Sequence, residues 1–304
     1  MNCVYCNKKG KIKTSTSSEE INNYYFKNFN FKAFESLNKI IHKYYCKSCN
    51  FYYYDRDLAG DDRYYELLQN NRKGYYNPNR KEYEYAKSYS DKKKSVLEIG
   101  CGAGFFADKI EFKSYKGLEF NQMAIDKSIA KGYDVIKESI EDFCENSNDK
   151  YDVIFSFHVL EHVENPITFI SSAKKMLKKN GKLVIAVPNN DSILTSGKNV
   201  ILNIPPHHIN QYTREAIRNI TNYHNLELER LDDVFIGEPK SKISYNSLSL
   251  TNLYFRFFND SELIDTKSFD KIRYRFKKLL KKVWSIYPFK MDVQGENLLI
   301  VLKK

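Results

Sequence analysis

Short apolar runs alternate with helical patterns from Ser95 onward. The runs are short enough to be single buried strands, and between them apolar residues recur every three or four positions. Strands that alternate with helices form a parallel sheet covered on both faces. The pattern therefore predicts an α/β fold. Its expected strands are 95–99, 114–120, 133–137, 151–157, 182–189 and 296–304.

The segments between these runs predict helices and one loop. FFADKI (105–110) should open a helix, and a second helix should cover 122–131. ESIEDF (138–143) is expected to be a loop. Asn165 and the proline after it predict a helix start, since asparagine caps helices and proline suits the first turn. This helix should end at Asn180–Gly181.

A glycine-rich turn, Gly100–Gly104, follows the first strand directly. Such a turn before a helix lets the backbone approach a ligand and offers it unpaired N–H groups. Phe105 stands where a dinucleotide fingerprint needs a small residue, and Glu98 would repel a pyrophosphate but suits an ammonium group. The pattern thus disfavours NAD and predicts a cationic cofactor. Glu119, at the tip of the second strand, is placed to bind both ribose hydroxyls of a nucleoside.

Two Cys-x-x-Cys pairs lie near the start of the chain, Cys3 with Cys6 and Cys46 with Cys49. Four thiolates leave Zn²⁺ no open position, which indicates a structural metal. The pairs are farther apart in sequence than in most zinc sites, so an insertion must loop out between them. Two alternatives stay open: unpaired thiols in a disordered start, or His42 in place of one cysteine.

Composition and charge bear on whether the protein binds nucleic acid or spans a membrane. The formal charge of +11 and pI of about 9.1 suit nucleic acid, but lysine predominates and accompanies abundant Asn, Tyr and Ile, so a dedicated nucleic-acid surface is disfavoured. No apolar stretch reaches the roughly 20 residues that span a bilayer, and the start lacks a signal-peptide core. A cytoplasmic protein is expected, with Cys101 and Cys144 as ordinary packing residues.

Two further segments each allow two interpretations, one as packing structure and one as a binding surface. The tyrosine-rich stretch 51–94 is expected to be amphipathic helix packed on the next domain, or alternatively a cover over a ligand. Apolar residues recur at helical spacing among lysines and arginines in 268–286. This basic amphipathic helix should pack on the domain, or alternatively contact a membrane surface or an anionic substrate.

Six motifs in order, LEIGCGAG, GLEF, ESIEDF, YDVIFSFHVLEHV, MLKKNGKLVIAVPN and PPHHINQYT, resemble class I S-adenosylmethionine-dependent methyltransferases. The similar group contains ubiquinone-biosynthesis O-methyltransferases and polysaccharide-tailoring enzymes. The resemblance implies a Rossmann-like seven-stranded mixed sheet that binds S-adenosylmethionine. Its implied cofactor residues are Glu98, Gly100, Cys101, Gly102, Gly104, Glu119, Ser139, Ile140, Glu141 and Phe157, with Ser139 where the group often has aspartate.

The cysteine pairs ahead of this domain resemble bacterial methyltransferases of surface-polysaccharide and deoxysugar pathways. The deoxysugar C-methyltransferases carry a further large domain for which this chain has no room, so O-methylation of a sugar or sugar-linked group is expected. An RNA methyltransferase and a non-catalytic S-adenosylmethionine-binding scaffold are the alternatives. The expected organisation is a zinc-ribbon-like module (1–55), a tyrosine-rich cover (56–94) and the methyltransferase domain (95–304), with an insertion at about 237–295.

Removing the proton of a hydroxyl acceptor calls for a base near neutral pH, and histidine fits best. His158 and His162 follow the fourth strand, and His207 and His208 follow the fifth, where this topology opens its crevice. His162 or His208 is predicted to be the base, and Glu161 could orient an imidazole. The acceptor is expected to be a small molecule or glycan.

Overall fold

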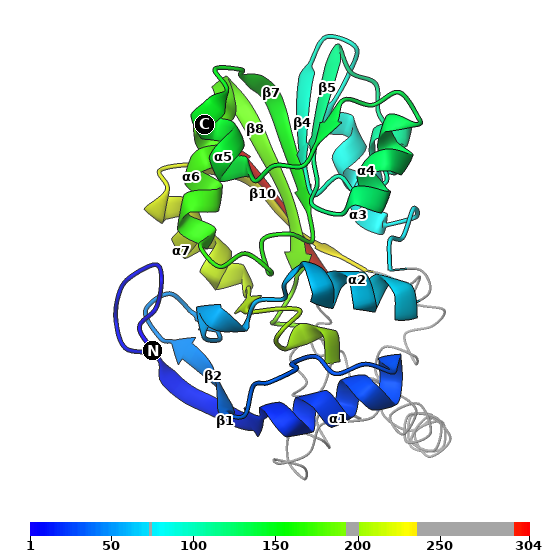
Figure 1. Ribbon diagram of the computed structural model, residues 1–304. Helices are drawn as coiled ribbons and strands as arrows, with labels where there is room; N and C mark the ends of the chain where they lie inside the picture. Colours follow the sequence, from blue (N-terminus) through cyan, green and yellow to red (C-terminus); the bar gives the residue numbers. More distant parts are fainter. Residues whose placement is uncertain (73–74, 193–200, 236–294) are drawn as a thin grey trace, which may run out of the picture.

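The computed structural model describes residues 1–72, 75–192, 201–235 and 295–304, and two sheets organise them (Figure 1). The larger sheet has seven strands in the order β10-β11-β8-β7-β4-β5-β6, and the smaller has the order β1-β2-β3-β9. In the larger sheet β11 runs antiparallel to both neighbours, whereas β8, β7, β4, β5 and β6 pair in parallel. The predicted Rossmann-like seven-stranded mixed sheet is confirmed.

The strands of the larger sheet alternate their side chains between two apolar cores. Along β4, Val96 packs in one core and Leu97 in the other, and both are fully buried. The expected strands from the sequence reappear in order. Their bounds are β4 (Ser95–Ile99), β5 (Ser114–Leu118), β6 (Val135–Ile136), β7 (Tyr151–Phe157), β8 (Leu177–Pro188) and β11 (Asn297–Lys303), and the seventh strand, β10 (Glu227–Val234), was not expected from the sequence.

Four capped helices cover this sheet. In each, the side chain before the first turn accepts a hydrogen bond from a backbone N–H of that turn, which stabilises the helix start. Helices α5, α6 and α7 contribute to the core on the Leu97 face, and α4 contributes to the core on the Val96 face. The bounds are α4 (Gln122–Ile129), α5 (Ile140–Asn146), α6 (Pro166–Met176) and α7 (Arg214–Tyr223).

Three local expectations were wrong. The helix expected from FFADKI is only a 3₁₀ turn, η3 (Ala107–Lys109). Residues 105–113 must lead the chain back along β4 to the start of β5 at Ser114, and as a continuous helix they would be only about 14 Å long, too short to do so. ESIEDF is not a loop, since Ser139 caps α5 within it. The helix after Asn165 ends at Met176, four residues early, because β8 already begins at Leu177.

The N-terminal segment folds as strand, helix, strand, strand. The insertion between the cysteine pairs contains β1 (Lys11–Ser17), α1 (Ser18–Phe29) and the start of β2 (Ile40–Cys46), which leads into β3 (Phe51–Tyr53). A third apolar core joins α1 to the following helix α2 through Tyr25 and Tyr64, whose hydroxyls are 2.8 Å apart. The tyrosine-rich stretch holds η1 (Arg56–Leu58), α2 (Asp62–Asn71), α3 (Lys81–Ala86) and η2 (Lys87–Tyr89).

The two sheets are joined by a segment that lies far along the chain. After η4 (Ile201–Asn203), strand β9 (Asn210–Gln211) pairs antiparallel with β3 and so completes the N-terminal sheet. Figure 1 shows the N-terminal sheet beneath the carboxyl ends of the parallel strands, with α2 between them. The first residues therefore face the edge of the large sheet where ligands bind in such folds.

Two expectations concern residues outside this description. The insertion expected at about 237–295 lies almost wholly outside the described residues, and the basic helix expected at 268–286 lies wholly outside them. Within the described part of the chain, no helix combines the length and the apolar character needed to cross a membrane.

Candidate active site and metal centre

The glycine-rich turn after β4 has backbone angles that only glycine adopts without strain. Gly100 has φ of +73°, and a Cβ there would meet Val159 Cγ2 at 2.4 Å. Gly102 has φ of +54°, and its missing Cβ leaves room for the ring of Tyr76. The turn is therefore in direct contact with the loop after β7 and with the tyrosine-rich segment.

Glu119 holds this turn in place. One carboxylate oxygen accepts a hydrogen bond from the Gly102 N–H at 2.8 Å, and the other accepts from the N–H groups of Phe120 and Asn121. The predicted ribose-binding carboxylate therefore does lie beside the glycine-rich turn.

Glu98 is buried beside the same turn, on the opposite side of β4 from Leu97. It is 1% exposed, and the Tyr115 hydroxyl donates a hydrogen bond to it at 2.7 Å. Burial raises the pKa of Glu98 to about 8, with the hydrogen bond from Tyr115 opposing the rise. The carboxyl is therefore mostly protonated at neutral pH, and an ammonium group brought next to it would favour its charged form.

We expect Glu98→Gln to remove a pH dependence of stability. The pKa of Glu98 in the folded chain, about 8, lies above its ordinary value of 4.5, so its stabilising contribution is full below pH 4.5 and is lost as pH rises towards 8. Relative to the parent, the glutamine variant should gain up to a few kcal/mol over that range. Thermal unfolding at stepped pH measures this, with the exposed Glu145→Gln as control. A difference that stays constant with pH would contradict the protonated state.

The other predicted cofactor residues take varied positions. Ser139 is the cap of α5, and its hydroxyl both accepts from the Asp142 N–H and donates to the Asp142 carboxylate. Ile140 is 1% exposed and belongs to the core, so only its backbone is offered to a ligand. The remaining three are Cys101 and Phe157, both buried in the core on the Val96 face, and Glu141, which is half-buried.

The tyrosine-rich segment covers the glycine-rich turn. The Tyr76 ring lies 3.0 Å from where a Gly102 Cβ would stand, and its hydroxyl accepts from Gln69 on α2. Gln69 in turn accepts from the side chain of Asn121, two residues after Glu119. These contacts support the cover interpretation. The sequence offered no pairing signal for Tyr76 or Gln69, so only their tyrosine-rich setting pointed to them.

His158 is clamped between two buried carboxylates. Its Nδ1 lies 3.2 Å from Glu161 and its Nε2 lies 3.1 Å from Glu82, a residue of α3 that the sequence did not single out. Burial and Arg80 lower the pKa of His158, but the two carboxylates outweigh them and raise it. Burial alone would raise the pKa of Glu161, yet His158 and its neighbours hold it at about 2. The two carboxylates thus favour the charged form of His158.

The other three crevice histidines form one cluster. The centroids of their rings are 4.6–4.8 Å apart, and their candidate ligand nitrogens all lie within 4.8 Å of one another. Tyr65 of the cover contacts this cluster through a 3.1 Å hydrogen bond to Nδ1 of His162. Burial lowers the pKa of His162 and, helped by the neighbouring imidazoles, lowers those of His207 and His208 further. The three rings are therefore neutral at neutral pH.

The segment that carries His207 and His208 is held by the backbone on both sides. The N–H groups of Ile209 and Asn210 both donate to the Glu161 carbonyl, and the Ile209 carbonyl accepts from the Tyr54 N–H. Thr213 Oγ1 donates to the Asn50 carbonyl at 2.8 Å, directly after the second cysteine pair. The N-terminal sheet therefore fixes the position of the histidine cluster.

The four N-terminal cysteines also come together. Their sulfur atoms all lie within 4.8 Å of one another, and Cys6 and Cys46 are 3.4 Å apart. A tetrahedral zinc with Zn–S bonds of about 2.3 Å keeps its sulfurs about 3.8 Å apart, so the donor set fits such an ion. His42 is not part of the cluster, since it bonds Ser15 at 2.8 Å on the module surface. The alternative with His42 as a ligand is therefore wrong.

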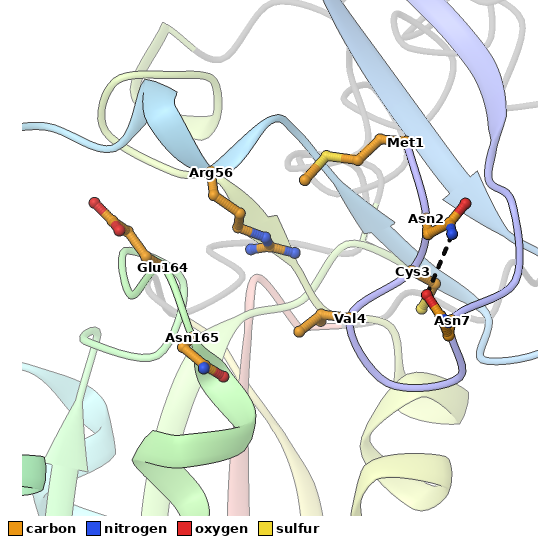
Figure 2. Close-up of a pocket in the computed structure, with 8 residues that line it drawn as sticks. All are labelled: Met1, Asn2, Cys3, Val4, Asn7, Arg56, Glu164 and Asn165. Carbon is orange, nitrogen blue, oxygen red and sulfur yellow. Dashed lines mark hydrogen bonds between the residues drawn. The ribbon is translucent and has the colours of Figure 1, made fainter.

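A surface cleft of about 460 Å³ lies between the chain start and α6. Figure 2 shows Arg56 reaching into it, facing Met1 and Val4, with Glu164 and Asn165 on the opposite wall. The cleft is not lined by the glycine-rich turn, by Glu119 or by the histidine cluster. The cleft is thus separate from the crevice, and we do not assign the cofactor to it.

Comparison with known proteins finds related domains. A family model described as "Methyltransferase domain" matches residues 68–231, more than half of the chain. The ubiquinone biosynthesis O-methyltransferase of Vibrio atlanticus is 30% identical over 121 residues, 37% of this chain and 51% of that protein. The protein of the same name from Glaesserella parasuis is 34% identical over 110 residues, 32% of this chain and 46% of that protein. The chain spans about half the length of these curated relatives.

A solved structure shares the fold. The S-adenosylmethionine-dependent methyltransferase from Archaeoglobus fulgidus superposes with a TM-score of 0.50 at 20% sequence identity, over 79% of this chain and 100% of that chain. At this identity the likeness shows the fold alone.

Proposed function

Because the chain belongs to the methyltransferase-domain family, we propose that it transfers a methyl group from S-adenosylmethionine to a hydroxyl oxygen of a sugar or sugar-linked group during assembly of surface polysaccharide. The observation that carries the proposal is the meeting of two parts at the carboxyl ends of the strands. The glycine-rich turn with Glu119 suits a nucleoside, and the loop after β7, which touches that turn, carries part of a cluster of neutral imidazoles.

The residues present fit the cofactor. Gly100 and Gly102 let the backbone of the turn run close to its neighbours without a Cβ, Glu119 stands where ribose hydroxyls would donate to it, and Glu98 lies buried nearby for an amino group. When bound, S-adenosylmethionine supplies a methyl group on a positively charged sulfur. The protein's tasks are then to align the acceptor, exclude water and remove one proton.

The histidine cluster is suited to the proton step. Because Nδ1 of His162 is directed at the His207 carbonyl and Nδ1 of His208 lies 3.0 Å from the Asn203 amide oxygen, each ring keeps Nε2 as its basic nitrogen. Either nitrogen can accept the acceptor's proton. The tyrosine cover, which touches both the glycine-rich turn and the cluster, would limit access of water to both.

We also propose that the four cysteines bind a structural zinc. Support comes from their clustering and from the all-thiolate donor set, which closes the coordination sphere. A sugar-linked acceptor is supported by the resemblance of this cysteine module and domain to polysaccharide-tailoring enzymes, and an oxygen acceptor by the names of the curated relatives.

The direct test is mass spectrometry of the host's surface glycans with the gene present and deleted, together with calorimetry of S-adenosylmethionine binding by the purified chain. The proposal expects one methyl group per repeat to disappear on deletion. Cofactor binding without any change in the glycans would overturn the acceptor, and lack of cofactor binding would overturn the enzyme itself. RNA binding that weakens steeply with salt would favour an RNA acceptor instead.

Glu119→Ala should weaken S-adenosylmethionine binding by about 1.5–3 kcal/mol, or roughly 10–150-fold. The variant loses the ribose acceptor and also frees the Gly102 N–H that the carboxylate now holds. Calorimetric titration measures the affinity, and Glu145→Ala, which removes an exposed carboxylate from α5, is the matched control. An affinity equal to that of the parent would show that the cofactor does not contact the tip of β5.

A further inference from the structure

The three imidazoles of His162, His207 and His208 lie in contact with one another. They come from two loops, one after β7 and one before β9, and their candidate ligand nitrogens all lie within 4.8 Å of one another. His207 and His208 are 6% and 8% exposed. Buried polar groups are normally paired, so such a cluster needs a partner for its lone pairs.

Hydrogen bonds orient two of these rings as metal ligands are oriented. Nδ1 of His162 faces the His207 carbonyl, which can only accept, so this nitrogen carries the proton and the Tyr65 hydroxyl, 3.1 Å from it, acts as an acceptor. Nδ1 of His208 lies 3.0 Å from Oδ1 of Asn203. A histidine that ligates a metal through one nitrogen usually donates from the other to a carbonyl or amide oxygen, which leaves the ligating lone pair free. Here both free lone pairs are on Nε2.

A buried carboxylate faces those lone pairs. Oε1 of Glu161 is 3.8 Å from Nε2 of His208 and 4.0 Å from Nε2 of His162, distances too long for hydrogen bonds. Oε2 of Glu161 and Nδ1 of His207 are both buried and have no hydrogen-bond partner among the described residues. Nδ1 of His158 lies 3.2 Å from Oε1 of Glu161, but no hydrogen bond joins this carboxylate to the Nε2 lone pairs of His162 and His208, and a cation among them would relieve their repulsion.

We propose that the imidazoles of His162, His207 and His208 bind one divalent transition-metal ion of the zinc type, with the Glu161 carboxylate beside it. A nitrogen-rich donor set selects zinc-like ions over magnesium or calcium. Ligand atoms of a tetrahedral ion with bonds of about 2.0–2.1 Å lie about 3.4 Å apart, so small rotations of the rings would complete the site.

Three protein ligands leave a tetrahedral ion one open position, as in catalytic metal sites. This consequence rests on the proposed function: an acceptor hydroxyl bound at that position would lose its proton more readily. The imidazoles would then act through the ion instead of as free bases. Metal binding itself does not depend on the proposed function.

The site is tested by counting metal ions in the full-length chain, purified without chelator from zinc-sufficient medium. The parent should hold two zinc ions per chain, one at the cysteines and one at the histidines. His207→Ala and His208→Ala should each hold one, and the control His42→Ala, which alters a surface histidine of the N-terminal module, should hold two. Circular dichroism shows whether each variant is folded, independently of cofactor binding.

Cobalt substitution identifies which site each ion occupies. Thiolate-to-cobalt charge transfer reports the cysteine site, and weaker d–d bands without charge transfer report the imidazole site. His208→Gln should lose the second signal and keep the first. A parent chain that holds a single ion, or two ions in both histidine variants, would overturn the proposal. A failure of the proposed function would instead appear as absent cofactor binding with the metal count unchanged.

Discussion

His162→Ala is expected to lower methyl-transfer turnover by about 10²–10⁴-fold, the usual loss when a proton-accepting group is removed. His162 lies in the loop after β7, within reach of the glycine-rich turn through Val159 and of the cover through Tyr65. Its imidazole does not contact the predicted ribose carboxylate. Single-turnover rates with the natural acceptor should therefore fall, whereas calorimetric affinity for S-adenosylmethionine should change only a few-fold.

His208→Ala tests the same cluster from its other loop, and His42→Ala controls for loss of a histidine elsewhere. If one of His162 and His208 is the free base, its variant should lose turnover and the other variant should lose stability. If both hold an ion, both should lose turnover. Should neither variant slow turnover more than a few-fold, the proton step would pass to Glu161, His207 or a tyrosine of the cover.

Cys46→Ser should abolish zinc binding at the cysteine cluster and inactivate the enzyme, although the cluster is not in the crevice. Structural zinc supplies about 10–16 kcal/mol of apparent binding free energy to small modules, so the N-terminal sheet should unfold while the large sheet stays folded. Strand β9 would then lose β3, its partner, and the histidines before it would lose their position. Turnover should fall by about 10²-fold or more, as for removal of the cluster itself.

Zinc content, turnover and circular dichroism of the variant check this prediction together. Cys144→Ser is the matched control, because Cys144 is a half-buried thiol on α5 outside the cluster. A Cys46→Ser protein that lacks zinc but turns over normally would show that the N-terminal sheet does not position the histidines.

The parallel sheet could be predicted from sequence because its strands are apolar runs whose buried side chains follow from local spacing alone. Glu119 at the tip of β5 and the glycine-rich turn after β4 followed from the same local order. The four cysteines could be grouped because thiolate spacing is itself a signal. The predicted ends of helices were wrong where the next strand begins after a short connection, as with the 3₁₀ turn η3 and the early end of α6.

The remaining contacts depend on residues that no local pattern connects. Glu82, which clamps His158, comes from a helix 76 residues earlier, and Tyr115, which bonds Glu98, lies on the neighbouring strand. The pairing of β3 with β9 joins two short segments whose letters, FYY and NQ, carry little strand signal. Each of these contacts is set by the tertiary fold, and sequence spacing alone could not show which residues it would bring together.

The completion of the N-terminal sheet by β9 has a consequence for synthesis on the ribosome. The cysteines and three of the four strands of that sheet emerge first, but Asn210 and Gln211 follow only after most of the large sheet. At about 5–20 residues per second, the early strands wait on the order of ten seconds with the β3 edge unpaired. An unpaired edge invites pairing with other chains. Metal capture by the cysteines would not close this edge, because β9 alone pairs with it, so the window lasts until Gln211 has emerged.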